Sequence, residues 1–142
     1  MMIDTQIITP VIALVTWSLV MWTWMYATRL PALAKAKMEM DPNAPSGVQM
    51  AQLPAQVRWK ADNYNHLMEQ PTIFYALVIS LALLGEGDGI NLILAWSYVC
   101  LRIVHSLVQS LINKIELRFV IFSLSSFALF GLAINAGIAV LS

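Results

Sequence analysis

Four polar side chains lie along one side of an otherwise apolar stretch, residues 98–118. Tyr98, Arg102, His105 and Gln109 follow one another at steps of four, three and four residues, which places them on one stripe of a helix. Ionisable side chains within a membrane-spanning segment are functional candidates, because lipid cannot solvate them. We therefore expect this stripe to face protein or water.

A second polar stripe precedes the apolar run IFYALVISLALL. Asp62, Asn65, His66 and Glu69 share one helix face at relative positions zero, three, four and seven. The rise of a helix places His66 and His105 at about the same depth, so the two stripes can meet. Together they would line a polar pocket that opens to the cytoplasm and is closed by apolar packing.

The same arithmetic predicts an ion pair between Glu69 and Arg102. Glu69 lies about 13 Å and Arg102 about 16 Å from the cytoplasmic edge of the span. An unpaired charge in hydrocarbon would be unfavourable by at least about a few kcal/mol, so we expect a buried pair. Hydrogen bonding between helices would explain such a pair without any function. The whole set of polar groups exceeds what pairwise contacts require, which favours a functional site.

Two other chemistries are less favoured by the residues. His66, His105 and Glu69 are metal-ligand types, but the order His-x-x-Glu is opposite to the Glu-x-x-His of di-iron helices, and the chain has only two histidines. A hydrolase is not indicated, because there is no GxSxG motif and Ser106 or Ser110 lacks a convincing third partner beside His105.

The composition is typical of an integral membrane protein. Of the 142 residues, 59% are hydrophobic and 11% are charged, and the mean hydropathy is +0.72. About four spans of roughly 20 residues would use up the chain, which predicts an all-α bundle in one domain, residues 1–142. Equal numbers of basic and acidic residues, eight each, give no argument for a nucleic-acid partner. The lone Cys100 is expected to be a small buried hydrophobe.

Turn and cap residues mark the ends of the expected spans. Thr9 and Pro10 are typical of a helix start, and Pro31 is expected to close the first span. No basic region or cleavage pattern indicates a signal peptide, so we expect this span to be retained. The predicted spans are residues 9–30, 60–84, 90–111 and 118–141, with a polar cytoplasmic loop at 31–56.

Basic residues near the span ends predict the orientation. The side with residues 31–60 and 112–118 has seven of them, and the side with both termini and the 85–89 turn has none. The positive-inside rule places the first side in the cytoplasm and both termini outside. The seven are Arg29, Lys35, Lys37, Arg58, Lys60, Lys114 and Arg118.

Two segments carry a family resemblance. The sequences ADNYNHLMEQPTIFYAL and YVCLRIVHSLVQSLINKIELRFVIF resemble the MAPEG family, membrane-associated proteins in eicosanoid and glutathione metabolism, and in particular its bacterial members. The resemblance implies a four-helix bundle that assembles as a homotrimer. For a bacterial member we expect the inner membrane, where the orientation predicted from the basic residues makes both termini periplasmic. The resemblance also implies that glutathione binds between neighbouring subunits near the cytoplasmic face.

The resemblance implies a role for individual residues as well. Arg118 matches an arginine that stabilises the glutathione thiolate as it attacks a lipophilic molecule. In this sequence His66 replaces the asparagine of an Asn-x-x-Glu motif, Asp62 replaces an arginine, and Gln109 replaces a tyrosine of several eicosanoid enzymes. The candidate glutathione-binding residues are Arg29, Asn65, His66, Glu69, Tyr98, Arg102, His105 and Gln109.

Two functions follow from these observations. The first is a glutathione transferase or peroxidase-like enzyme that acts on lipophilic electrophiles. The second is a non-enzymatic lipid-binding or accessory subunit of a larger membrane complex, which would keep the polar network for structure. An open cavity shared by Arg118, His66 and Arg102 would favour the enzyme, whereas donors satisfied within the protein would favour the accessory subunit. A transporter is less favoured, because no inverted repeat or glycine-broken helix is visible.

Overall fold

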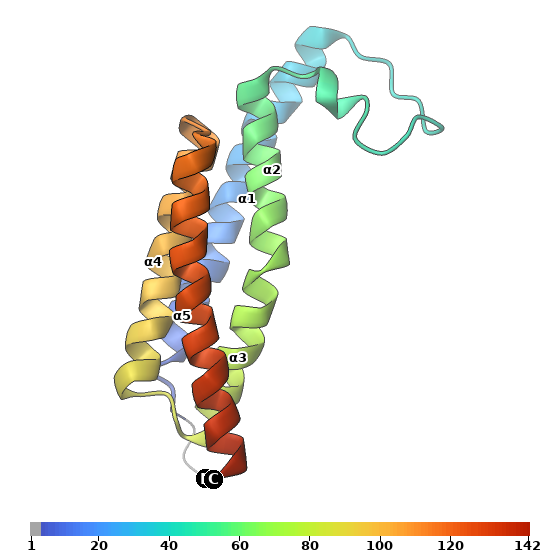
Figure 1. The fold of residues 1–142 in the computed structure, drawn as a ribbon. Coiled ribbons are helices and arrows are strands. Elements are labelled where there is room, and N and C mark those ends of the chain that lie inside the picture. Colours follow the sequence, from blue (N-terminus) through green and yellow to red (C-terminus); the bar gives the residue numbers. More distant parts are fainter. Residues whose placement is uncertain (1–3) are drawn as a thin grey trace.

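Four long apolar helical spans form a bundle, which confirms the predicted all-α membrane protein. The computed structural model describes residues 4–142, and Figure 1 shows its helices. The helices α2 and α3 follow each other directly and together make one candidate span, Ala55–Leu84. The elements are α1 (Ile8–Ala36), a short 3₁₀ helix η1 (Met50–Gln52), α2 (Ala55–Glu69), α3 (Pro71–Leu84), α4 (Gly89–Leu111) and α5 (Ile115–Leu141).

The first helix extends past its expected end. Pro31 lies inside α1, which continues to Ala36 and ends at Lys37 in the left-handed conformation, with a φ of 47°. A proline inside a helix removes one backbone hydrogen bond, but the following residues ALAKA are strong helix formers. The prediction that Pro31 closes the first span is therefore wrong.

A proline also separates α2 from α3 without turning the chain. Pro71 occupies the first position of α3, where its missing N–H is tolerated, and Gln70 keeps helical dihedral angles. The hydroxyl of Thr72 donates to the carbonyl oxygen of Glu69 at 2.7 Å, which satisfies one carbonyl at the end of α2. The two helices therefore remain nearly collinear (Figure 1), with the polar half packed mainly on α1 and α4 and the apolar half mainly on α5 and α1.

Apolar side chains from all four spans fill the centre of the bundle. Phe74 stacks on Tyr98, with ring centroids 4.5 Å apart and an interplanar angle of 15°. Both rings are fully buried. Cys100, in contrast, is exposed, so its predicted burial is wrong. It lies two residues from both Tyr98 and Arg102 on α4, and this spacing turns it to the opposite side of the helix.

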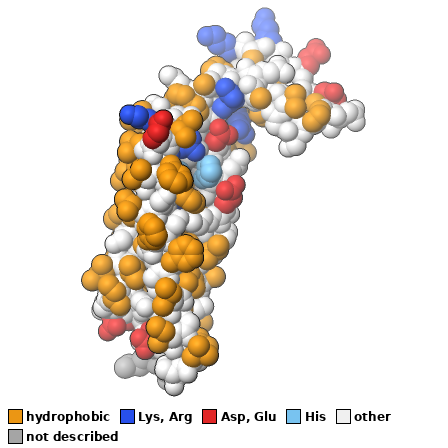
Figure 2. Space-filling model, in the orientation of Figure 1, with side chains coloured by type: hydrophobic (Ala, Val, Ile, Leu, Met, Phe, Trp, Pro, Cys, Tyr) orange, Lys and Arg blue, Asp and Glu red, His pale blue; other side chains and the backbone are white. Residues whose placement is uncertain are grey.

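The two ends of the bundle carry different charges. One end holds the loop between α1 and α2 and the turn between α4 and α5, and we call it the basic end. Figure 2 shows blue Lys and Arg side chains together with acidic ones at this end, while the charged side chains visible at the other end are acidic. Lys60 fixes the basic end by donating to the carbonyl oxygen of Ser110 on α4 at 3.4 Å and lying 5.0 Å from the Trp24 ring on α1.

Candidate active site

Two adjoining cavities lie between α2 and α5 near the basic end, with α4 behind them. The polar cavity has a volume of about 270 Å³ and is lined by Asp62, Asn65, His66, Glu69, Gln109 and Arg118. The apolar cavity has a volume of about 350 Å³ and is lined by His66, His105, Ile115, Arg118, Phe119 and Phe122. The structure thus brings the polar stripe of α2 together with His105 and Gln109, the part of the α4 stripe nearer the basic end, as the sequence predicts.

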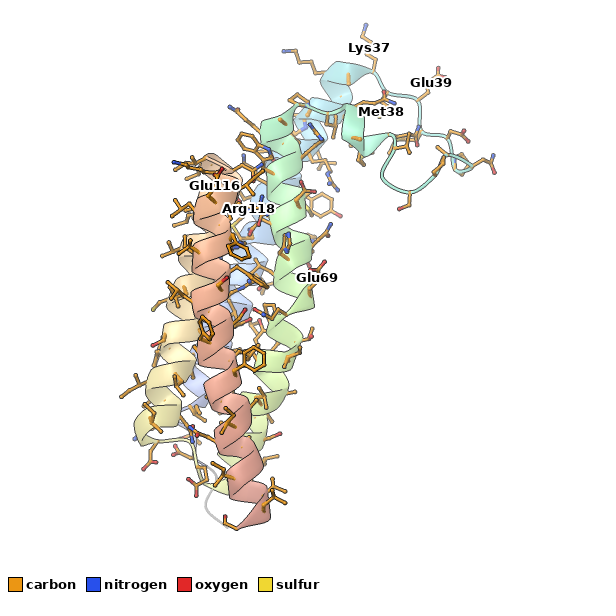
Figure 3. The ribbon with its side chains drawn as sticks, viewed as in Figure 1. Lys37, Met38, Glu39, Glu69, Glu116 and Arg118 are labelled. Atoms are coloured by element: carbon orange, nitrogen blue, oxygen red, sulfur yellow. The ribbon has the colours of Figure 1, made fainter. Side chains whose placement is uncertain are left out.

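His66 and Arg118 line both cavities and therefore mark the border between them. Figure 3 shows Arg118 near the start of α5 on the side toward α2, with Glu69 further along α2. In Figure 2 a histidine lies among acidic and basic side chains, next to the hydrophobic surface. A charged or polar group and an apolar molecule can therefore be held side by side at this border.

The local fold of the α4–α5 turn positions Arg118. Helix α5 begins at Ile115, earlier than predicted, so that Arg118 lies in its first turn. Asn113 adopts the left-handed conformation, with a φ of 52°, which asparagine tolerates better than most residues. Its Oδ1 accepts a hydrogen bond of 2.6 Å from Nη1 of Arg118. The Nε of Arg118 is buried and has no acceptor among residues 4–142, and the residue lines both cavities.

His66 is held from two sides. Its Nδ1 lies 3.6 Å from Oε2 of Glu69, three residues further along α2. Its backbone carbonyl accepts a hydrogen bond of 2.9 Å from Nη2 of Arg102 on α4. The His66 ring also lies edge-on to the His105 ring, with 6.2 Å between their centroids. Arg102 thus holds the backbone of His66, while the imidazole lies near Glu69 and His105 at the border of the two cavities.

The predicted ion pair between Glu69 and Arg102 is not formed. Arg102 is only 1% exposed, and its guanidinium lies 5.7 Å from the Phe122 ring. The Glu69 side chain is 69% exposed and contacts His66 instead. The similar depth of Glu69 and Arg102 along their helices did not determine the direction in which the Glu69 side chain points. Buried Leu67 marks the inward face of α2, and Glu69, two residues later, points to the other side.

Two further predicted site residues lie away from these cavities. Tyr98 is fully buried, and its hydroxyl lies 3.3 Å from Oε1 of Gln70, whose Nε2 donates to Ser126 of α5 at 3.0 Å. Arg29 lines a third cavity of about 340 Å³, formed with Arg58 and the 46–51 segment. This cavity shares Asp62 and Asn65 with the polar cavity, so the three cavities follow one another along α2.

Sequence reasoning missed the apolar wall and the residue that orients Arg118. Phe122 follows Arg118 at four residues, a spacing that places it on the same side of α5, and Phe119 is the next residue along the helix. That spacing was a usable signal, whereas the contact between Asn113 and Arg118 depends on the conformation of a turn. The described residues contain no group of three or more His, Cys, Asp or Glu side chains that could hold a metal ion.

Comparison with known proteins adds one finding to this geometry. The sequence model described as the MAPEG family matches residues 7–138, which include every helix that lines the cavities. No curated protein and no solved structure matches the chain.

Proposed function

The chain belongs to the MAPEG family, and we propose that it is a membrane-bound glutathione transferase that conjugates lipophilic electrophiles. Members of this family are often glutathione-dependent enzymes. The observation that carries the proposal is the position of Arg118 and His66, which line a polar and an apolar cavity at once. A transferase that joins a hydrophilic thiol to an apolar molecule requires this kind of border.

The polar cavity supplies groups that suit a charged peptide. The carboxylates of Asp62 and Glu69 can attract the ammonium group of glutathione, and Asn65 and Gln109 offer amide donors and acceptors. Arg118 can pair with a carboxylate or with the thiolate. We therefore place glutathione in the polar cavity with its sulfur toward Arg118.

The apolar cavity supplies the place for the second substrate. Ile115 and Phe119 are 72% and 68% exposed, so this cavity borders the surface that the helices present to lipid. A lipophilic molecule can enter from the bilayer and place an electrophilic carbon near the sulfur. The guanidinium of Arg118 favours thiolate over thiol, and the thiolate is the attacking form.

We also propose the assembly that the family resemblance implies and the orientation that the basic residues predict. The protein would be a homotrimer in the bacterial inner membrane, with glutathione bound near the cytoplasmic face and both termini periplasmic. The excess of Lys and Arg at the basic end supports this orientation. The opening of the polar cavity at a side of the single chain leaves room for a neighbouring subunit to cover it.

The competing function is a non-enzymatic lipid-binding or accessory subunit of a larger membrane complex. It predicts that the donors of Arg118, His66 and Arg102 are satisfied within the protein. Among residues 4–142, Nε of Arg118 and both Nε and Nη1 of Arg102 have no acceptor. The cavities that Arg118 and His66 share support the enzyme over the accessory subunit, although Arg102 lines neither of them.

Turnover of a lipophilic probe tests the proposal. The purified protein in detergent is incubated with glutathione and 1-chloro-2,4-dinitrobenzene, and formation of the conjugate is followed. We expect Arg118→Ala to lower kcat/KM by about 100-fold or more, because a positioned donor for a developing anion contributes that much. Lys114→Ala is the matched control, since Lys114 lies in the same turn but lines neither cavity. Equal rates for both variants would contradict the role of Arg118.

A further inference from the structure

We propose that His66 is the general base that removes the proton from the glutathione thiol, with Glu69 stabilising the imidazolium that forms. This inference deepens the proposed transferase function and rests on it. It adds a second catalytic residue to Arg118. The two residues have different tasks, because a guanidinium can stabilise an anion but cannot accept a proton.

The position of the imidazole beside a carboxylate carries the proposal. Nδ1 of His66 lies 3.6 Å from Oε2 of Glu69, an ion-pair distance for the protonated ring that is longer than a hydrogen bond. A neutral ring with its hydrogen on Nδ1, toward this carboxylate, has its lone pair on Nε2 for a proton from the substrate. A carboxylate beside an imidazole also stabilises the imidazolium, as in other nucleophile-activating sites. His66, unlike Arg118, therefore has the parts of a base.

The location of the ring supports the same role. His66 is 38% exposed and lines both cavities, so a thiol in the polar cavity and an acceptor in the apolar cavity can each reach it. His105 is only 3% exposed, lines the apolar cavity alone and has no carboxylate within ion-pair distance among the described residues. Of the two histidines, His66 is the one placed to exchange a proton with both substrates.

Charged and titratable groups from three helices surround this imidazole. Asp62 and Glu69 lie on its own helix α2, Arg102 and His105 lie on α4, and Arg118 lies on α5. The two carboxylates favour the imidazolium and the two guanidinium groups favour the thiolate. Proton transfer creates the His66 imidazolium and the glutathione thiolate, and each of these ions would thus have side chains of opposite charge nearby.

The reaction can be written with all atoms balanced for an epoxide. The S–H proton moves to Nε2 of His66, and the sulfur electron pair forms a bond to one epoxide carbon. The C–O bond at that carbon breaks, and its electron pair stays on oxygen. The imidazolium then returns the proton from Nε2 to the alkoxide, which regenerates neutral His66. The step needs only the thiol and the epoxide, and the product is a hydroxy thioether.

Chemical rescue of His66→Ala tests the proposal, with styrene oxide as the probe. We expect kcat/KM to fall by about 100-fold, the lower part of the range for a general base. Added imidazole should restore part of the rate, and the restored rate should rise with neutral imidazole as the pH is increased. A residue with only a structural role would not give this dependence. Glutathione affinity, measured by calorimetry, should remain within about threefold of the wild type.

A second pair of variants decides the question if His66→Ala does not fold. Glu69→Gln should lower kcat/KM by about tenfold, because a carboxylate that supports a base contributes less than the base itself. Glu86→Gln is the matched control, since Glu86 is exposed at the opposite end of the bundle. We expect its rate to equal that of the wild type.

The outcomes separate this inference from the proposed function. If His66→Ala keeps the wild-type rate, or binds glutathione normally but is not rescued by imidazole, the role of His66 is overturned and the transferase remains. If Glu69→Gln and Glu86→Gln have the same rate, the role of Glu69 is overturned. If the wild-type protein neither binds glutathione nor turns over the probe, both the function and this inference are overturned.

Discussion

At the scale of single residues, the site depends on where each polar side chain points. The spacing of His66 and His105 on two helices predicts their meeting, and their rings lie 6.2 Å apart at the centroids. The same spacing cannot predict the partner of Arg102, because depth along a helix does not fix the direction around it. Arg102 reaches the backbone of His66 at 2.9 Å, and no sequence pattern marks a carbonyl oxygen as a partner.

The contacts of Arg102 and Glu69 predict unequal effects of mutating them. Arg102→Ala should destabilise the protein by about 3 kcal/mol, because it removes a buried side chain and its bond to α2. Glu69→Gln should change stability by less than about 1 kcal/mol, since an exposed ion pair contributes little. Thermal unfolding in detergent measures both. A large loss of stability for Glu69→Gln would instead support the ion pair between Glu69 and Arg102. Recovery of stability in a double variant with the two charges exchanged would support it as well.

At the scale of elements, helix ends decide which residues line the cavities. The apolar runs predict four spans, and turn glycines predict the break near residue 85. Pro31 was a misleading signal, because the helix-forming residues after it and the packing of α1 outweigh one lost hydrogen bond. The start of α5 at Ile115 adds Ile115 to the apolar cavity, which the predicted start at residue 118 did not suggest.

The turn before α5 gives a prediction about Asn113. Asn113→Gly keeps the left-handed conformation but removes the acceptor for Nη1 of Arg118. We expect it to fold normally and to lose about tenfold in kcat/KM, because Arg118 is no longer oriented. Asn113→Asp keeps an acceptor and is the control, with a rate near that of the wild type. Equal rates for the two variants would show that Asn113 does not position Arg118.

At the scale of the whole molecule, hydropathy and charge determine the architecture. Four apolar spans and the family match agree on a membrane-embedded bundle, and every cavity of the proposed site lies toward its basic end. The bundle and its basic end can be predicted from the sequence, because hydrophobic periodicity and composition are averaged over many residues. The division into a polar and an apolar cavity cannot, since it depends on which faces of α2 and α5 meet above α4.

The orientation in the membrane can be measured with single cysteines. In a Cys100→Ser background, Ser46→Cys lies in the loop of the basic end and Ser142→Cys lies at the other end. A membrane-impermeant maleimide added to right-side-out vesicles should label position 142 at once and position 46 only after permeabilisation. Labelling in the reverse order would place the polar cavity outside the cytoplasm, away from its proposed thiol.

Calorimetric titration of the wild-type protein with glutathione is the most direct test of the central claim. We expect saturable binding that Arg118→Ala weakens by about tenfold or more and that Lys114→Ala leaves unchanged. Of these two residues, Arg118 lines the polar cavity and Lys114 does not. A titration without binding up to millimolar glutathione would contradict the proposal. It would mean that Asp62 and His66 have adapted the polar cavity to a ligand other than this thiol.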